Sequence, residues 1–176
     1  LKKINAVKNV KDLQALLIEM EPTGGIGFFG AGVGTDAKNS NVNVINLGPG
    51  GVGLPDRDYY VSDEKDSKEK REKYVLHVAK MLQYLGDKPE QAKANAEKIL
   101  ALEIEMSKPR FDRVERRDRR KSYNPMTVAE IQKLTPSIDW TTYFTKIGLP
   151  TNQTIIVSQP KYMTALETLF KENKVD

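Results

Sequence analysis

The sequence predicts a mainly α fold: an orthogonal bundle of about six helices with a small β-hairpin near the N-terminus. Two observations predict it. In most of the chain, apolar residues recur three and four positions apart, which is the spacing of one face of an α-helix. Apolar and polar residues alternate in one short stretch only, at residues 42–47, behind the turn-prone residues 36–41. The hairpin is therefore expected at about residues 28–47.

The helices have local start and stop signals. Asn9, Thr127 and Asp139 are good N-caps, Pro89 and Pro160 suit a first helical turn, and Gly86 suits a C-terminal stop. Residues 154–157 are short and β-branched, which predicts a strand or an extended link. The expected helices cover residues 9–20, 74–85, 89–106, 128–134, 140–147 and 160–170.

Length and composition indicate one soluble domain, residues 1–176. The chain is 39% hydrophobic and 30% charged, and no apolar run is long enough to cross a bilayer, so no membrane contact by this segment is expected. It begins with Leu1 and not with Met, which favours an excised segment. It has no cysteine and a single histidine, His77, so disulfides and thiolate metal sites are excluded.

Four blocks of sequence resemble one family. They are V-G-T-D-A-K-N-S at residues 33–40, G-L-P-D-R-D-Y-Y at residues 53–60, Y-N-P-M-T at residues 123–127 with D-W at residues 139–140, and V-S-Q-P-K-Y-M at residues 157–163. In this order they resemble the N-terminal region of the neprilysin and endothelin-converting-enzyme zinc metallopeptidases.

The resemblance implies a function for a larger protein. Family members carry HExxH and a downstream glutamate ligand in a C-terminal half that this sequence lacks. The segment would be the helical lid that faces the catalytic domain of its own chain across a closed cavity and limits substrates to peptides. Zinc would belong to the parent protein, and no catalytic, cofactor-binding or metal residue of the family matches a position here. Since animal members are disulfide-bonded, the absence of cysteine favours a bacterial protein, periplasmic or cell-envelope rather than cytoplasmic.

Three motifs could indicate other chemistry. Residues 25–30 spell GxGxxG, but a dinucleotide site needs a strand before this string and a helix after it, and here the order is reversed. Asp56 and Asp58 could form a pair of catalytic carboxylates, although Arg57 between them favours a charge-assisted bond that closes the loop. His77 alone cannot form an HExxH zinc site, which needs two histidines. We therefore expect no catalytic site in this segment.

The basic segment, residues 110–121, accounts for the formal charge of +4 because it holds seven basic residues and three acids. Its interleaved acids, Asp112, Glu115 and Asp118, favour internal salt bridges. The alternative function is a stand-alone helical interaction domain that binds nucleic acid through this segment, but base-stacking aromatic residues are missing apart from Phe111. The favoured interpretation has no nucleic-acid partner.

Overall fold

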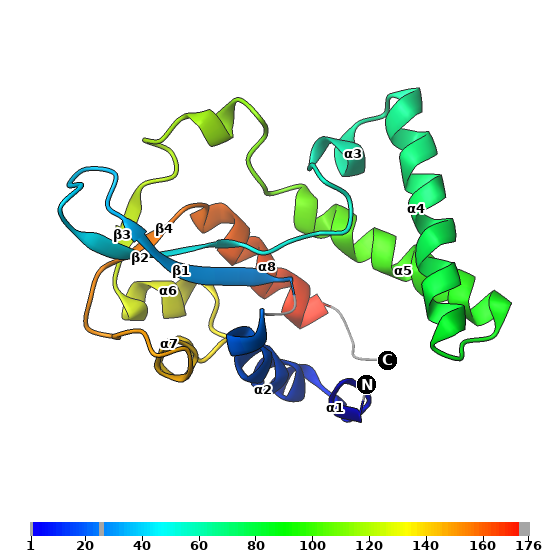
Figure 1. Ribbon diagram of the computed structural model, residues 1–176, viewed down its shortest axis with the longest axis horizontal. Helices are drawn as coiled ribbons and strands as arrows, with labels where there is room; N and C mark the ends of the chain where they lie inside the picture. Colours follow the sequence, from blue (N-terminus) through cyan, green and yellow to red (C-terminus); the bar gives the residue numbers. More distant parts are fainter. Residues whose placement is uncertain (1, 25–26, 173–176) are drawn as a thin grey trace. The chain divides into compact units, whose positions relative to one another are not determined.

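The computed structural model describes residues 2–24 and 27–172 (Figure 1). The chain divides into two compact units, unit 1 with residues 1–51 and 113–176 and unit 2 with residues 52–112. Helices predominate in the described residues, as the sequence predicts. The expectation that residues 1–176 form one domain, meaning one cooperatively folding unit, stays a prediction.

Unit 1 contains a four-stranded sheet. Its strands in the order β1-β2-β4-β3 are β1 (Phe29–Thr35), β2 (Asn43–Pro49), β4 (Ile155–Val157) and β3 (Asn124–Met126). The β1–β2 hairpin is confirmed, and so is the strand at residues 154–157. The hairpin is part of a larger sheet than the sequence predicts, because β4 pairs parallel with β2, and β3, which the sequence does not predict, pairs antiparallel with β4.

Five α-helices belong to unit 1. They are α1 (Lys2–Asn5), α2 (Val10–Met20), α6 (Val128–Leu134), α7 (Trp140–Lys146) and α8 (Pro160–Glu172), with two 3₁₀ turns, η1 (Glu21–Thr23) and η2 (Glu115–Arg117). The three expected N-caps are present. Asn9 accepts the Asp12 N–H at 3.0 Å, Asp139 accepts the Thr142 N–H at 2.9 Å, and Thr127 forms a capping box with Glu130. These side chains satisfy backbone donors that would otherwise be unpaired.

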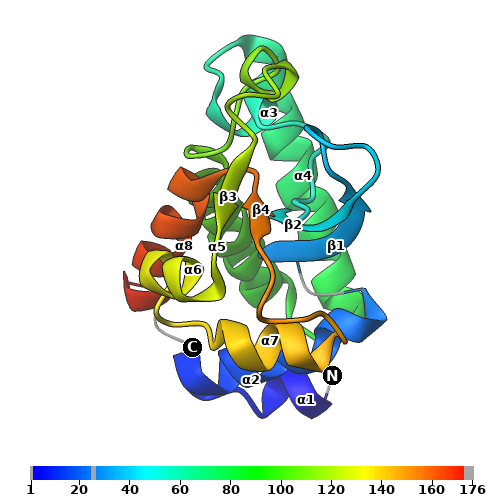
Figure 2. The same ribbon diagram turned by 90° about the vertical axis from the view of Figure 1, so that its left-hand side faces the viewer.

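An aromatic cluster forms the centre of unit 1. Trp140, Tyr143 and Phe144 of α7 are completely buried. The ring of Phe29 from β1 lies 4.9 Å from that of Trp140 and 5.2 Å from that of Tyr143, centroid to centroid. Helices α2 and α7 lie side by side in this unit (Figure 2). The expected aromatic face of α7 is therefore the core.

Unit 2 is helical. It comprises α3 (Asp58–Val61), α4 (Lys65–Tyr84) and α5 (Pro89–Ser107), and α4 and α5 form the expected antiparallel pair. Their contact is built on the small residues Ala79, Ala92 and Ala96, which allow close approach. Gly86 ends the first helix with a φ of 109°, a conformation that favours glycine.

Two expectations for α4 need correction. The helix begins at Lys65, nine positions before the expected start, because salt bridges at i,i+4 spacing, such as Lys70–Asp66, support its charged first turns. Met81 and Leu85, whose spacing in the sequence predicts the apolar face of this helix, are 45% and 61% exposed. The contact between α4 and α5 is built on alanines. The buried face of α4 is therefore narrower than the spacing of its apolar residues indicates.

Candidate functional site

The loop at residues 53–60 is anchored by a polar cluster in unit 2. We call Gly53, Tyr60, Tyr74 and Glu103 the Glu103 cluster. Tyr60 is 2% exposed and Tyr59 is half-buried. The main chain turns tightly here, because Asp56 Oδ1 accepts the Asp58 N–H at 3.2 Å and the short helix α3 follows. This turn directs the tyrosine toward α5.

The carboxylate of Glu103, on α5, accepts hydrogen bonds from the loop. Its Oε1 accepts the Gly53 N–H and its Oε2 accepts the Tyr60 hydroxyl, both at 2.9 Å. The Tyr60 oxygen in turn accepts the Leu54 N–H at 2.6 Å. A charged acceptor makes hydrogen bonds stronger than neutral ones. One side chain therefore fixes both ends of the loop.

Tyr74 of α4 completes the cluster. Burial raises the pKa of Tyr60 and of Tyr74, and the neighbouring Glu103 carboxylate raises both further, because a second negative charge there is unfavourable. Gly53 is required for close approach, since a Cβ at that position would clash with the Tyr74 hydroxyl. The sequence indicates Glu103 only as an acid among the otherwise apolar residues of the inward face of its helix.

Two arginines support the same loop. Arg71 Nη1 donates to the carbonyl oxygens of Tyr59 and Ser62 at 2.7 and 2.9 Å. Arg57 donates to Asp58 Oδ1 at 3.4 Å and to the Lys108 carbonyl, at the end of α5, at 3.5 Å. The sequence offers Asp56, Asp58 or a helix C-terminus as partners of Arg57, and the structure shows Asp58 and the end of α5. Asp56 closes the turn and Asp58 contacts Arg57, so both carboxylates of this loop have structural contacts.

Unit 1 has a second polar contact between distant residues. Asp36, in the hairpin turn, accepts the Lys38 N–H at 2.7 Å and the Tyr123 hydroxyl at 3.1 Å. Lys38 Nζ lies 4.3 Å from the centroid of the Tyr123 ring. The structural role expected for Asp36 is confirmed. Tyr123 holds the turn against the segment that leads into β3.

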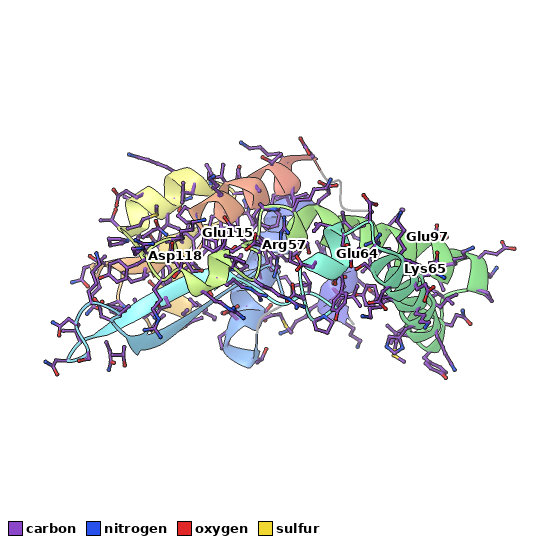
Figure 3. The ribbon with its side chains drawn as sticks, turned by 90° about the horizontal axis from the view of Figure 1, so that it is seen from above. Arg57, Glu64, Lys65, Glu97, Glu115 and Asp118 are labelled. Carbon is purple, nitrogen blue, oxygen red and sulfur yellow. The ribbon has the colours of Figure 1, made fainter. Side chains whose placement is uncertain are left out.

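The basic segment is partly self-paired, as predicted. Arg120 Nε lies 3.1 Å from Asp118 Oδ1, and Lys121 Nζ lies 3.2 Å from Glu115 Oε1. Figure 3 shows both acids close together along this stretch. The guanidinium of Arg120 holds the pKa of Asp118 below its usual value. These pairs reduce the net positive field that a nucleic-acid backbone would meet.

The described residues do not fit a zinc ion. Nowhere among them do three or more His, Cys, Asp or Glu side chains gather as metal ligands would. His77 is exposed on α4. Of the glycine string at residues 25–30, Gly25 and Ile26 lie outside the described residues, and the strand β1 begins within the string, at Phe29. Within the described ranges no helix has the length and apolarity to span a membrane.

A family model and several curated proteins match this chain in sequence. The N-terminal model of peptidase family M13 matches residues 1–176. Endothelin-converting enzyme 1 of Cavia porcellus is 33% identical over 147 residues, which are 81% of this chain and 19% of that protein. Neprilysin-3 of Drosophila melanogaster is 29% identical over 116 residues, 66% of this chain and 15% of its own length. The chain thus spans about a fifth of the length of the curated relatives it matches.

Solved structures give the same picture. The Mycobacterium tuberculosis zinc metalloprotease Zmp1, in complex with an inhibitor, matches 98% of this chain and 26% of its own with a TM-score of 0.87 and 28% identity. PepO from Lactobacillus rhamnosis HN001 matches 94% of this chain and 26% of its own with a TM-score of 0.81. At 16% identity, PepO supports the fold alone.

Proposed function

The chain belongs to peptidase family M13, and from this we propose that it is the non-catalytic helical portion of a neprilysin-like zinc metalloendopeptidase. In this role it covers the active-site cavity and restricts substrates to peptides, while the C-terminal part of the same polypeptide hydrolyses the peptide bond. A bacterial enzyme of the periplasm or cell envelope is part of the proposal, and cell fractionation with an antibody to this segment tests it.

One observation carries the proposal. The fold of Zmp1 matches almost all of this chain at a TM-score of 0.87, yet the match takes up only 26% of Zmp1. The segment therefore corresponds to one portion of a larger zinc metalloprotease. Its own residues supply a single exposed histidine and no cysteine. A zinc ion held by the remaining polypeptide would activate the hydrolytic water.

The residues of this segment have structural tasks in the proposed enzyme. The Glu103 cluster and Arg71 fix the loop at residues 53–60 on α5, and the aromatic cluster fixes α7 on β1. A cover over a cavity must keep its shape in order to exclude large substrates. Charge-assisted hydrogen bonds and interlocked aromatic rings provide this rigidity.

The test compares the full-length protein with the 176-residue chain. We expect the full-length protein to bind zinc stoichiometrically by calorimetry and to cleave a quenched bradykinin-like peptide, and the 176-residue chain to do neither. Stoichiometric zinc or turnover by the 176-residue chain contradicts the non-catalytic role. For the covering role, cleavage of peptides of increasing length should fall sharply beyond a limit. Equal rates on short peptides and on unfolded casein contradict a closed cavity.

The alternative of a nucleic-acid-binding domain gains no support from the comparisons. It makes an opposite prediction that is simple to check. We expect binding of labelled duplex DNA to vanish at about 150 mM salt, because few basic residues in residues 110–121 are available for phosphates. Fluorescence anisotropy measures this. Affinity tighter than about 1 μM at that salt concentration would favour the alternative.

A further inference from the structure

β1 forms one edge of the sheet, because the strand order is β1-β2-β4-β3. Two hydrogen bonds set the direction of its main-chain groups. The Asp36 N–H donates to the Val42 carbonyl at 2.9 Å, and the Gly50 N–H donates to the Phe28 carbonyl at 3.2 Å. In an antiparallel ladder, hydrogen-bonded pairs alternate with non-bonded pairs.

The two hydrogen bonds therefore determine in which direction the main-chain N–H and C=O groups of each β1 residue point. Its three glycines, Gly30, Gly32 and Gly34, direct N–H and C=O groups toward β2. Val33 and Thr35 direct theirs to the free edge, where no described residue forms a hydrogen bond with them. Val33 is 61% exposed. Two donors and two acceptors in strand geometry therefore face outward.

This edge lacks the usual protection. Natural sheets block free edges with a lysine, a proline, a bulge or a covering element, because an open edge pairs with any extended chain. The sequence of β1, FGAGVGT, contains no charge and no proline, and its register with β2 runs without a bulge from Phe29 to Thr35. The chemical features that usually block strand addition are therefore absent from β1.

A pocket of about 370 Å³ lies beside the same strand. Ala31 and Gly32 of β1 line it, together with Glu21 of η1 and with Lys146 and Leu149 at the end of α7. Its volume is near the lower end for ligand pockets and suits a single side chain. It carries one acid and one base, so it can pair with a side chain of either charge.

A buried polar group lies next to this pocket. Among the described residues, the hydroxyl of Tyr143 is buried without a hydrogen bond of good geometry. Burial is the largest cause that raises the pKa of Tyr143, and the neighbouring Glu21 carboxylate is the second. The Ala31 main chain also lies close to this hydroxyl. Both neighbours line the pocket. The interactions of the Tyr143 hydroxyl with Glu21 and Ala31 thus connect the wall of this pocket to the aromatic core of unit 1.

We propose that the free edge of β1 binds the peptide substrate in an extended conformation by strand addition. Alternate main-chain groups of the peptide pair with Val33 and Thr35, and one side chain enters the pocket beside Ala31 and Gly32. Main-chain pairing recognises a peptide without regard to its sequence. This inference rests on the proposed function, because it identifies a surface by which the covering portion selects peptides.

The test replaces Val33 by proline in the full-length protein. Val33→Pro removes one outward N–H, and proline is accepted in edge strands where the N–H faces solvent. The matched control, Val33→Ala, keeps the N–H. We expect Val33→Pro to raise the KM for the quenched peptide about fivefold with kcat nearly unchanged, as the loss of one hydrogen bond implies, and Val33→Ala to resemble the parent. Equal KM values for the two variants would overturn the proposal.

Hydrogen exchange gives a second measurement in case the proline variant folds poorly. In the unmodified full-length protein, the amides of Val33 and Thr35 should exchange fast without ligand and slowly with a peptide whose scissile bond is reduced. Slow exchange without peptide would mean that another segment of the protein or a second copy covers the edge. Fast exchange both with and without peptide would mean that no chain pairs with the edge. Either result overturns the proposal. Lack of zinc or turnover in the parent would instead contradict the proposed function.

Discussion

Unit 1 buries the rings of Trp140, Tyr143 and Phe144 completely, whereas the helical pair of unit 2 meets through Ala79, Ala92 and Ala96. The difference in buried apolar area per side chain is large, because aromatic side chains bury 150–250 Å² each by rough estimate. Unit 2 compensates with hydrogen bonds to the Glu103 carboxylate and from the Arg71 guanidinium. The two units therefore depend on different forces and should respond to different substitutions.

The largest effect is expected at the aromatic cluster. Trp140→Ala removes a completely buried ring that contacts Phe29, Tyr143 and Phe144, and should lower the free energy of unfolding by about 3–5 kcal/mol. Urea denaturation followed by circular dichroism measures it in the 176-residue chain. A loss below about 1 kcal/mol would show that this cluster does not dominate the stability of unit 1.

The matching change in unit 2 is Glu103→Gln. It keeps the shape of the side chain but replaces one charged acceptor oxygen by an N–H₂ group, which then faces the donor of either Gly53 or Tyr60. We expect a loss of about 1–2 kcal/mol in the free energy of unfolding, because one of the two donors loses its acceptor and the other keeps only a neutral one. The control is Glu105→Gln, which alters an exposed residue of the same helix. Equal midpoints for the two variants contradict the role of the Glu103 cluster.

Raising the pH to about 10.5 should lower the free energy of unfolding of unit 2 by less than Glu103→Gln does. At that pH only part of the tyrosine side chains in the unfolded chain is ionised. The pKa of Tyr60 and of Tyr74 is raised in the folded state above the ordinary value of 10.0. Their contribution is complete below pH 10 and falls as the pH rises toward the folded pKa, since the unfolded chain loses these protons first. Denaturation midpoints from pH 9 to 11 measure this, and Tyr74→Phe should reduce the slope.

The smallest change is expected at a helix cap in unit 1. Thr127→Ala removes the side-chain oxygen that accepts the Glu130 N–H at 3.2 Å, and should cost about 1 kcal/mol. Thr127→Ser keeps that oxygen and serves as the control. The difference between the two variants in thermal unfolding isolates the cap. A larger loss than for Trp140→Ala would reverse the ranking of forces within unit 1.

Local signals in the sequence predict much of this fold. The caps at Asn9, Thr127 and Asp139 and the stop at Gly86 each depend on residues within four positions, and each is present. The hairpin is likewise predicted, because its turn lies between its two strands. The charge-assisted bond of Arg57 that the sequence predicts is likewise found, with its neighbour Asp58 as the partner.

Pairings between distant residues could not be predicted in this way. β2 and β4 meet where Ile45 pairs with Ile155, and no property of either segment indicates which partner it takes. The same holds for the Glu103 cluster, where Gly53 and its acceptor lie fifty positions apart. The open edge of β1 follows from the strand order and so could not be identified before the sheet was known.

Native-state hydrogen exchange of the 176-residue chain tests the central comparison most directly. Amides of α7 and of β2 should exchange slowest, because they open only when the aromatic core of unit 1 unfolds, and amides of α4 and α5 should exchange faster through opening of unit 2. Glu103→Gln should accelerate exchange in α4 and α5 and leave α7 unchanged. Equal protection in both units, with Glu103→Gln accelerating all amides alike, would show one cooperative domain and contradict the division of forces described here.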